Sequence, residues 1–340
     1  MKNSNISVIP STQDSMERFP IRSLSEKTGV GTSTLRAWER RYGLLYPART
    51  PKGHRLYNGQ DVRRVLKILD LLNDGHSLPV IAQMLAVEVT ANTPVPNIKD
   101  ATAPISSFST TSEMSDIWEN FIQSGMDSIS DFNIERIDAI YNEASSLYPI
   151  EMVTERLIQP ILELLGEAWR QHPERGIAEE HFYTSWLKNR IGARFHHAYS
   201  HARGARIVCA CAPGNYHEIG LMLFALSALA RGYRVLYFGA DLPLNQLPYI
   251  AERSAARALV LSLPNHLHDP VEQIVDPALI HLPAEISTPV FIGGSDQQLD
   301  TSAFQAAGGI LLGANISVAI RVFESHIPVY PPASSTTRKR

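Results

Sequence analysis

Hydrophobic positions follow two different patterns along the chain, with the change near residue 204. Before it, apolar side chains recur every three or four residues, which is the spacing of one face of a helix. After it, five short apolar runs alternate with helical patterns, which predicts buried parallel strands with helices on both faces of the sheet. The predicted strands are Ala205–Cys211, Arg234–Phe238, Ala258–Leu263, Pro289–Ile292 and Gly309–Leu312. We therefore expect a multidomain α and α/β protein, with a Rossmann-like, flavodoxin-type sheet in its C-terminal part.

The pattern before residue 87 predicts a winged helix-turn-helix. Two short helices are separated by a turn at Gly29-Val-Gly31, and a ribbon that turns at Lys52-Gly53 follows them. Two more helices complete this order of elements, which is typical of DNA-binding heads. The predicted elements are Ile21–Thr28, Thr32–Tyr42, the ribbon Pro47–Tyr57, Val62–Leu72 and Pro79–Leu85.

Charge separates this region from the remainder. Residues 18–67 contain twelve Lys or Arg and three Asp or Glu, a net charge of +9. Since the whole chain has a net charge of −3, the other residues together carry −12. A basic block beside an acidic remainder indicates one nucleic-acid-binding module joined to a part of different function.

The basic side chains of the second helix and the ribbon are candidate contacts to a double-stranded DNA operator. A helix of this kind reads the major groove, and an Arg- and Lys-rich ribbon reaches the backbone or the minor groove. The candidate DNA-binding residues are Thr34, Arg36, Glu39, Arg40, Arg41, Tyr42, Lys52, His54 and Arg55.

Two segments of this region resemble the MerR family. They are Thr34-Leu-Arg-Ala-Trp-Glu-Arg-Arg-Tyr-Gly-Leu-Leu45 and Gly53-His-Arg-Leu-Tyr57. The Ala37-Trp38 pair is similar to the subgroup that contains the CarH, LitR and MlrA regulators rather than to the metal-sensing members. No cluster of cysteines follows, which argues against a mercury- or zinc-type sensor.

The division of the chain follows from composition and periodicity. Residues 87–113 are rich in Thr, Pro, Ser and Ala, as expected of a flexible linker. Helical periodicity then returns and predicts a four-helix bundle, whose third and fourth helices are Ile150–Trp169 and Ala178–His196. The expected domains are a disordered arm 1–18, the winged helix 19–86, the linker 87–113, the bundle 114–200, the α/β domain 201–325 and a tail 326–340.

The loops after the predicted strands carry the candidate ligand site. Asn215-x-His217-x-x-Gly220 follows the first strand, Ser262 lies in the third, and Gly293-Gly294 follows the fourth. This pattern resembles the cobalamin-binding domain of methionine synthase and of the mutases, in which an acidic residue stands at the position of Asn215. The resemblance implies that His217 is the lower axial ligand of cobalt, with Gly220, Ser262, Gly293 and Gly294 around the corrin and its tail. A carboxylate two residues before the histidine would hold its other ring nitrogen, and Asn215 supplies only a neutral amide.

A second motif lies at the junction of the last two predicted bundle helices. Trp169, Glu180 and His181 resemble the Trp…Glu-His motif with which the bundle of the CarH and LitR regulators covers cobalamin. Two departures are visible: the loop is one residue longer, and Arg170 stands where that family has a second cobalt-binding histidine. His172 is the residue nearby that offers an imidazole in its place.

These features favour a transcription regulator over an enzyme. The resemblance implies a repressor in the dark, with adenosylcobalamin as a light-sensing ligand that controls assembly as a dimer or tetramer and DNA binding. The alternative is a DNA-binding regulator whose degenerate cobalamin-like domain serves oligomerisation or a protein partner. A corrinoid methyl carrier is a third hypothesis, but such a chain has no need of a winged helix.

The remaining composition indicates a cytoplasmic protein without a membrane segment. No apolar run approaches the ~18 residues of a membrane span, and the N-terminus lacks the apolar region of a secretory signal. Cys209 and Cys211 alternate on one predicted strand and form neither a CxxC motif nor a disulfide framework. We expect them to face the same side of the sheet in a reducing compartment.

Overall fold

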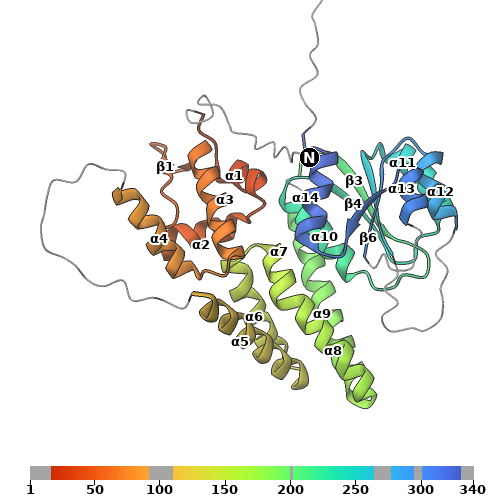
Figure 1. Ribbon diagram of the computed structural model, residues 1–340, viewed down its shortest axis with the longest axis horizontal. Helices are drawn as coiled ribbons and strands as arrows, with labels where there is room; N and C mark the ends of the chain where they lie inside the picture. Colours follow the sequence, from red (N-terminus) through yellow and green to blue (C-terminus); the bar gives the residue numbers. More distant parts are fainter. Residues whose placement is uncertain (1–16, 92–109, 200–201, 264–276, 295–300, 331–340) are drawn as a thin grey trace, which may run out of the picture. The chain divides into compact units, whose positions relative to one another are not determined.

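A computed structural model describes residues 17–91, 110–199, 202–263, 277–294 and 301–330 (Figure 1). Most of the predicted arm, linker and tail lie outside these residues. The chain forms two compact units. The first contains residues 1–127 and 135–149, and the second contains residues 128–134 and 150–340.

The first unit begins with the winged helix-turn-helix that the sequence predicts. The elements in order are α1 (Ile21–Thr28), α2 (Thr32–Tyr42), β1 (Ala48–Arg49), β2 (Arg55–Leu56), α3 (Gly59–Asn73) and α4 (Leu78–Ala91). Helix α3 starts three residues earlier than expected because Asn58 and Asp61 form a capping box. The Asn58 side chain accepts the backbone N–H groups of Gln60 and Asp61, and the Asp61 carboxylate accepts the N–H of Asn58.

Two further helices, α5 (Thr110–Ser130) and α6 (Ile134–Leu147), contribute to this unit, and α6 ends against α2. The last carbonyl groups of any helix lack intrahelical partners. Here the Trp38 indole donates to the carbonyl oxygen of Leu147 at 2.8 Å, and the Thr34 hydroxyl donates to that of Ser145 at 3.3 Å. The end of α6 is therefore capped by side chains of the winged helix-turn-helix, the head of this unit.

The second unit consists of helices followed by a five-stranded sheet. Its helical part comprises α7 (Ile150–Val153), a π-helical turn η2 (Thr154–Ile158), α8 (Gln159–Gln171) and α9 (Pro173–Tyr199). The strands are β3 (Arg206–Cys211), β4 (Arg234–Gly239), β5 (Ala258–Ser262), β6 (Val290–Gly293) and β7 (Ile310–Gly313). The helices among them are α10 (Ile219–Ala230), a 3-10 turn η3 (Leu244–Gln246), α11 (Leu247–Ser254), α12 (Pro277–Glu285), α13 (Thr301–Ala306) and α14 (Ile316–His326).

The sheet is parallel throughout and has the order β4-β3-β5-β6-β7, which confirms the flavodoxin-type fold. Helices α10 and α14 lie on one side of it, and α11, α12 and α13 on the other (Figure 1). Val208 and Ala210 belong to the core cluster that also contains Leu247 of α11, Leu279 of α12 and Phe304 of α13. Because side chains alternate along a strand, Cys209 and Cys211 face the opposite side, together, as predicted.

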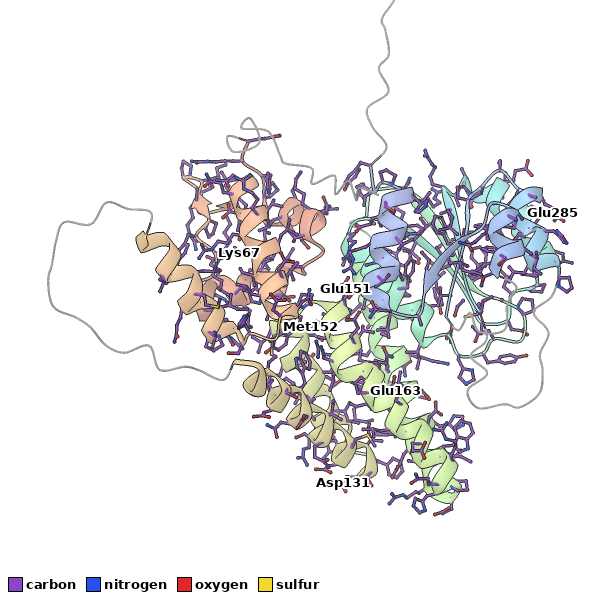
Figure 2. The ribbon with its side chains drawn as sticks, viewed as in Figure 1. Lys67, Asp131, Glu151, Met152, Glu163 and Glu285 are labelled. Atoms are coloured by element: carbon purple, nitrogen blue, oxygen red, sulfur yellow. The ribbon has the colours of Figure 1, made fainter. Side chains whose placement is uncertain are left out.

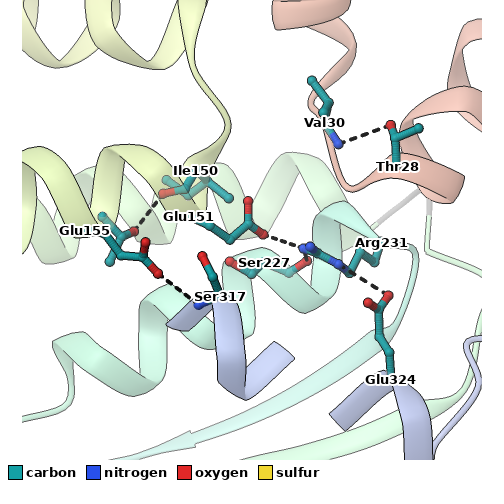
Figure 3. Close-up of polar contacts among 10 residues, drawn as sticks. Thr28, Val30, Ile150, Glu151, Glu155, Ser227, Arg231, Ser317 and Glu324 are labelled. Atoms are coloured by element: carbon teal, nitrogen blue, oxygen red, sulfur yellow. Dashed lines mark hydrogen bonds and ion pairs between the residues drawn. The ribbon is translucent and has the colours of Figure 1, made fainter. Parts of the chain in front are cut away.

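A partly buried group of ion pairs fastens α7 to the sheet domain (Figure 3). Arg231, the residue directly after α10, pairs with Glu151 of α7 and, at 3.3 Å, with Glu324 of α14. Burial lowers the pKa of Arg231, but the two carboxylates outweigh it and leave the pKa above its ordinary value. Glu155 of η2 adds a second link by accepting the N–H of Ser317 at the start of α14, at 3.1 Å.

The helices expected for a four-helix bundle at 114–200 are all found, but the contacts divide them between the two units. Helices α5 and α6 belong mainly with the head, and α8 and α9 belong with the sheet domain. The boundaries of the predicted domains therefore stay a prediction. None of the helices among the described residues is both long and apolar enough to cross a lipid bilayer.

The indole of Trp38 provides a test of the contact between α2 and α6. Trp38→Phe removes the donor and leaves the buried Leu147 carbonyl without it, a loss of ~1–3 kcal/mol of stability. We expect faster hydrogen exchange in peptides covering α2 and the end of α6, and unchanged exchange in β3 and β5. Tyr46→Phe is the control, since Tyr46 is a 72% exposed aromatic of the same head. Equal exchange in the Trp38 and Tyr46 variants would show that the indole bond contributes nothing.

Candidate functional site

The exposed face of α2 is basic. Arg36, Arg40 and Arg41 are exposed, together with Ser33, whereas Leu35 and Trp38 are fully buried. Three of the predicted DNA-binding residues thus lie on a solvent-facing surface of the helix that follows the turn. Tyr42 is half-buried at the end of this helix.

Two predicted DNA-binding residues take other roles. Thr34 is only 2% exposed, because its hydroxyl caps α6 rather than facing solvent. Glu39 accepts the Nε–H of Arg55 at 2.6 Å and also pairs with Arg49 at 3.3 Å. Because both partners lie on the ribbon, Glu39 braces the ribbon against α2, and Arg55 acts in that brace.

The ribbon turn keeps its free donors. Lys52 and His54 are exposed, and the turn is closed by the hydrogen bond from the N–H of Gly53 to the carbonyl of Thr50. The backbone of Tyr57 also pairs with that of Phe19, which adds one bridge beside the ribbon. A pocket at its base is lined by Arg18, Tyr46, Ala48, Leu56, Asn58, Gln60, Asp61 and Arg64.

In the second unit, His217 lies on the loop between β3 and α10, and its side chain is exposed. The strand that follows β3 in the chain, β4, lies on one side of β3, and the next strand, β5, lies on its other side. The strand order therefore reverses between β3 and β5. In open α/β sheets, ligands bind at this point, outside the carboxyl ends of the strands. The fold therefore places His217 where this architecture forms its ligand sites.

Asn215 fixes this loop to β5. Its side-chain nitrogen donates to the carbonyl oxygens of Ser262 and Leu263, both at 3.0 Å, and lies 3.1 Å from the Ser262 hydroxyl. Its side-chain oxygen accepts the backbone N–H of His217 at 3.0 Å. Asn215 is 1% exposed. Its described hydrogen bonds hold the backbone of His217 and do not reach the imidazole.

Asp241 holds the same loop from the side of β4. Its carboxylate accepts the N–H of Gly214 at 2.8 Å and the hydroxyl of Tyr216 at 3.1 Å. The hydrogen bond to Asp241 raises the pKa of Tyr216 above its ordinary value. The loop that carries His217 is therefore braced by residues that follow both neighbouring strands.

The predicted glycines differ in their surroundings. A Cβ at Gly220, in the first turn of α10, would meet no atom within 4 Å, so the space beside it is open. At Gly294, φ is +102° and a Cβ would lie 3.2 Å from the carbonyl oxygen of Leu263. A Cβ at Gly293 would lie 3.4 Å from the carbonyl oxygen of Gly313. Close packing against the neighbouring backbone therefore accounts for glycine at positions 293 and 294 without any ligand.

Trp169 lies at the tip of the α8–α9 hairpin and is half-buried. A single residue, His172, separates the two helices, so the junction that the sequence suggests as a loop is mostly helical. Gly176 allows this tight closure, because a Cβ there would lie 2.6 Å from the backbone of Ala168 and Trp169. Glu180 is half-buried and His181 is exposed on the first turns of α9.

Arg170 and His172, the residues considered for the second cobalt-binding position, both have described partners. Arg170 pairs with Glu167 on its own helix, with Nε 3.1 Å from the carboxylate. The His172 ring is exposed and lies 3.7 Å from the carboxylate of Glu174. In the structure both side chains thus engage neighbours in sequence.

Sequence reasoning missed the contact between α9 and the His217 loop. Lys188 of α9 lies 3.2 Å from the carboxylate of Glu218, the residue directly after His217. The other oxygen of Glu218 accepts the hydroxyl of Tyr237 on β4 at 3.0 Å. The available signal was a lysine at helical spacing from His181 and an acid beside His217, but their pairing depends on the tertiary fold.

Metal binding by a cluster of protein ligands has no support in the described part of the chain. Among those residues no group of three or more His, Cys, Asp or Glu side chains lies together. Burial raises the pKa of the Cys211 thiol to about 12, so this cysteine stays a neutral thiol.

Two family models match the chain. MerR HTH family regulatory protein matches residues 19–88, and B12 binding domain matches residues 126–194. The first spans the winged helix-turn-helix, and the second runs from the end of α5 through most of α9.

Curated relatives join the same two parts. The chain is 27% identical to the HTH-type transcriptional repressor CarH of Myxococcus xanthus, over 67% of this chain and 73% of CarH. It is 24% identical to the HTH-type transcriptional repressor CarA of the same organism, over 66% of this chain and 68% of CarA. Among solved structures, the monomethylamine corrinoid protein of Methanosarcina barkeri aligns with a TM-score of 0.46 and 14% identity, over 61% of this chain and 99% of that one. The chain thus combines a region that matches the MerR HTH model with one that matches the B12-binding model, and it is homologous to the CarH and CarA transcriptional repressors.

Proposed function

We propose that this DNA-binding regulator is a repressor in the dark and uses adenosylcobalamin as its light-sensing ligand. The observation that carries the proposal is the presentation of His217: an exposed imidazole on a loop braced by Asn215 and Asp241. The relatives CarH and CarA are named as repressors, which supports that direction of control.

The residues present fit the cofactor. His217 would hold cobalt from below, the open space beside Gly220 leaves room for the corrin, and Trp169, Glu180 and His181 would cover the upper side. When bound, adenosylcobalamin supplies a light-sensitive cobalt–carbon bond. The protein's part is to hold the group between α9 and the sheet domain and to couple its state to assembly, as a dimer or tetramer on the operator.

One observation favours the second candidate, a regulator whose cobalamin-like domain serves oligomerisation or a protein partner. Asn215 gives the imidazole of His217 no carboxylate partner, and losing such a partner typically costs ~10–100-fold in metal affinity. Under this reading, operator binding and its control are the same with and without corrinoids, in the dark and in the light.

Binding of the cofactor is tested first. We expect protein mixed with adenosylcobalamin in the dark to retain a corrin spectrum after desalting, and illumination to reduce operator binding. His217→Ala should lose the spectral signature of a protein nitrogen on cobalt and weaken binding beyond the ~10–100-fold effect of a supporting residue. His281→Ala, at an exposed histidine of α12, is the matched control. No retained corrin, or equal DNA binding before and after light, would favour the second candidate.

Replacing Asn215 by the family's acidic residue gives a second test. Asn215→Asp puts a carboxylate without a donor against the carbonyl oxygens of Ser262 and Leu263, so we expect a loss of ~1–3 kcal/mol rather than tighter cobalamin binding. These oxygens raise the pKa of the new carboxyl above its unfolded value near ~3.9. The folded state then binds more protons than the unfolded state, so the deficit grows as the pH rises above that value.

Urea unfolding at pH 5 and pH 8 measures this deficit, with Asn245→Asp at an exposed position as the control. Higher cobalamin affinity in Asn215→Asp, with no loss of stability, would show that the amide is no more than a weaker substitute for the acid.

DNA binding by α2 is tested with Arg36→Ala and Arg55→Ala on a duplex selected in vitro by the wild-type protein. Arg36 is exposed on α2, and we expect its loss to cost ~1–3 kcal/mol of binding free energy. Arg55→Ala should also weaken binding, because the ribbon loses its brace to Glu39. Affinity should fall steeply with salt for the wild type. Arg253→Ala on α11 removes the same charge outside the head and should leave binding unchanged. A flat salt response, or equal effects at all three positions, would contradict the assignment.

A further inference from the structure

One face of α9 contacts the sheet domain near the C-terminal end of the helix and is exposed nearer the hairpin tip. His181, Lys188 and Phe195 are spaced by seven residues, which places them along one side of a helix with a drift of only ~20° per step. Phe195 is 7% exposed, the Lys188 side chain is 39% exposed, and His181 is exposed. The face is thus buried near the C-terminal end of α9 and opens toward the hairpin tip.

Each of the two inner positions has a defined partner. The Phe195 ring lies 5.6 Å from that of Tyr237, and the Lys188 ammonium lies 3.2 Å from the carboxylate of Glu218. The Tyr237 hydroxyl donates to Glu218 as well, so the three side chains Lys188, Tyr237 and Glu218 form one connected group. Burial raises the pKa of Tyr237, so it stays a neutral donor to this carboxylate.

The next position along the face, His181, lies two turns beyond Lys188. Seven residues of helix span about 10 Å. Since Glu218 directly follows His217, the Lys188–Glu218 pair links the loop that presents His217 to the helix that carries Glu180 and His181.

We propose that Lys188 and Glu218 are positioning residues that set the gap in which an adenosyl-bearing corrin is held between His217 and the Glu180–His181 turn of α9. The inference rests on the proposed function and adds to it a distance-setting link. Lys188 and Glu218 act through His217 and α9, and neither needs to touch the ligand.

The test compares two corrinoids that differ in the size of the upper group. Lys188→Met and Glu218→Gln each remove the charge pair and keep the length of the side chain. We expect each to weaken binding of adenosylcobalamin about threefold, as suits a partly exposed pair. Hydroxocobalamin, whose upper ligand is small, should bind all variants within a factor of about 1.5, a difference that a general loss of stability would not produce.

The double variant and the reversed pair show whether the two residues act together. Lys188→Met with Glu218→Gln should be no weaker than either single variant, and Lys188→Glu with Glu218→Lys should recover part of the loss. Glu163→Gln is the matched control, since Glu163 is exposed on α8 (Figure 2). Circular dichroism and thermal melting of each full-length variant establish that it is folded.

The outcomes separate this inference from the proposed function. If the wild type retains neither corrinoid, the proposed function fails, and the gap-setting role fails with it. If the wild type binds adenosylcobalamin but both single variants bind it equally well, the gap-setting role alone is overturned. Additive losses, or equal losses for the two corrinoids, overturn it as well.

Discussion

The buried Arg231 is the constraint on which the second unit depends. A guanidinium withdrawn from water is tolerated only with carboxylate partners, and here one comes from α7 and one from α14. Removing Arg231 would leave two carboxylates without their counter-charge, and a shift of α7 would separate Glu151 from it, so α7 cannot shift on the sheet domain without loss of stability. Because α8 and α9 continue from α7, this pairing brings α9 beside β4 and gives the His217 loop its contact with Lys188.

The strands were predicted to within about one residue, since continuous apolar runs leave little choice once both faces of a sheet are covered. Helix ends were harder. The start of α3 depends on the pairing of Asn58 with Asp61, a local signal that the sequence does contain. The start of α9 at Pro173 depends on the close approach of Gly176 to Trp169, which no local pattern reveals.

The candidate site was predictable where it depends on a motif and not where it depends on tertiary partners. His217 is exposed on the expected loop. The Asn215 side chain donates to carbonyl groups 47 and 48 residues later in the chain. Because the sequence does not reveal these partners, the amide was interpreted only as a weaker substitute for the family's acidic residue. The helical pattern predicted that Thr34 contacts DNA. In the structure its side chain is buried against the end of α6, where it donates to the carbonyl of Ser145, 111 residues away.

The tight closure of the α8–α9 hairpin has a mechanical consequence. With one residue between the helices and no room for a Cβ at Gly176, the hairpin has no hinge at its tip. Twenty-two residues of α9 separate Phe195 from Pro173, about 33 Å of continuous helix. The hairpin therefore moves as one rigid body about the contact of Phe195 with Tyr237. A tilt of α9 by about 5° at this contact moves the hairpin tip by about 3 Å. A change of atomic size beside β4 thus becomes a displacement as large as a side chain at Trp169.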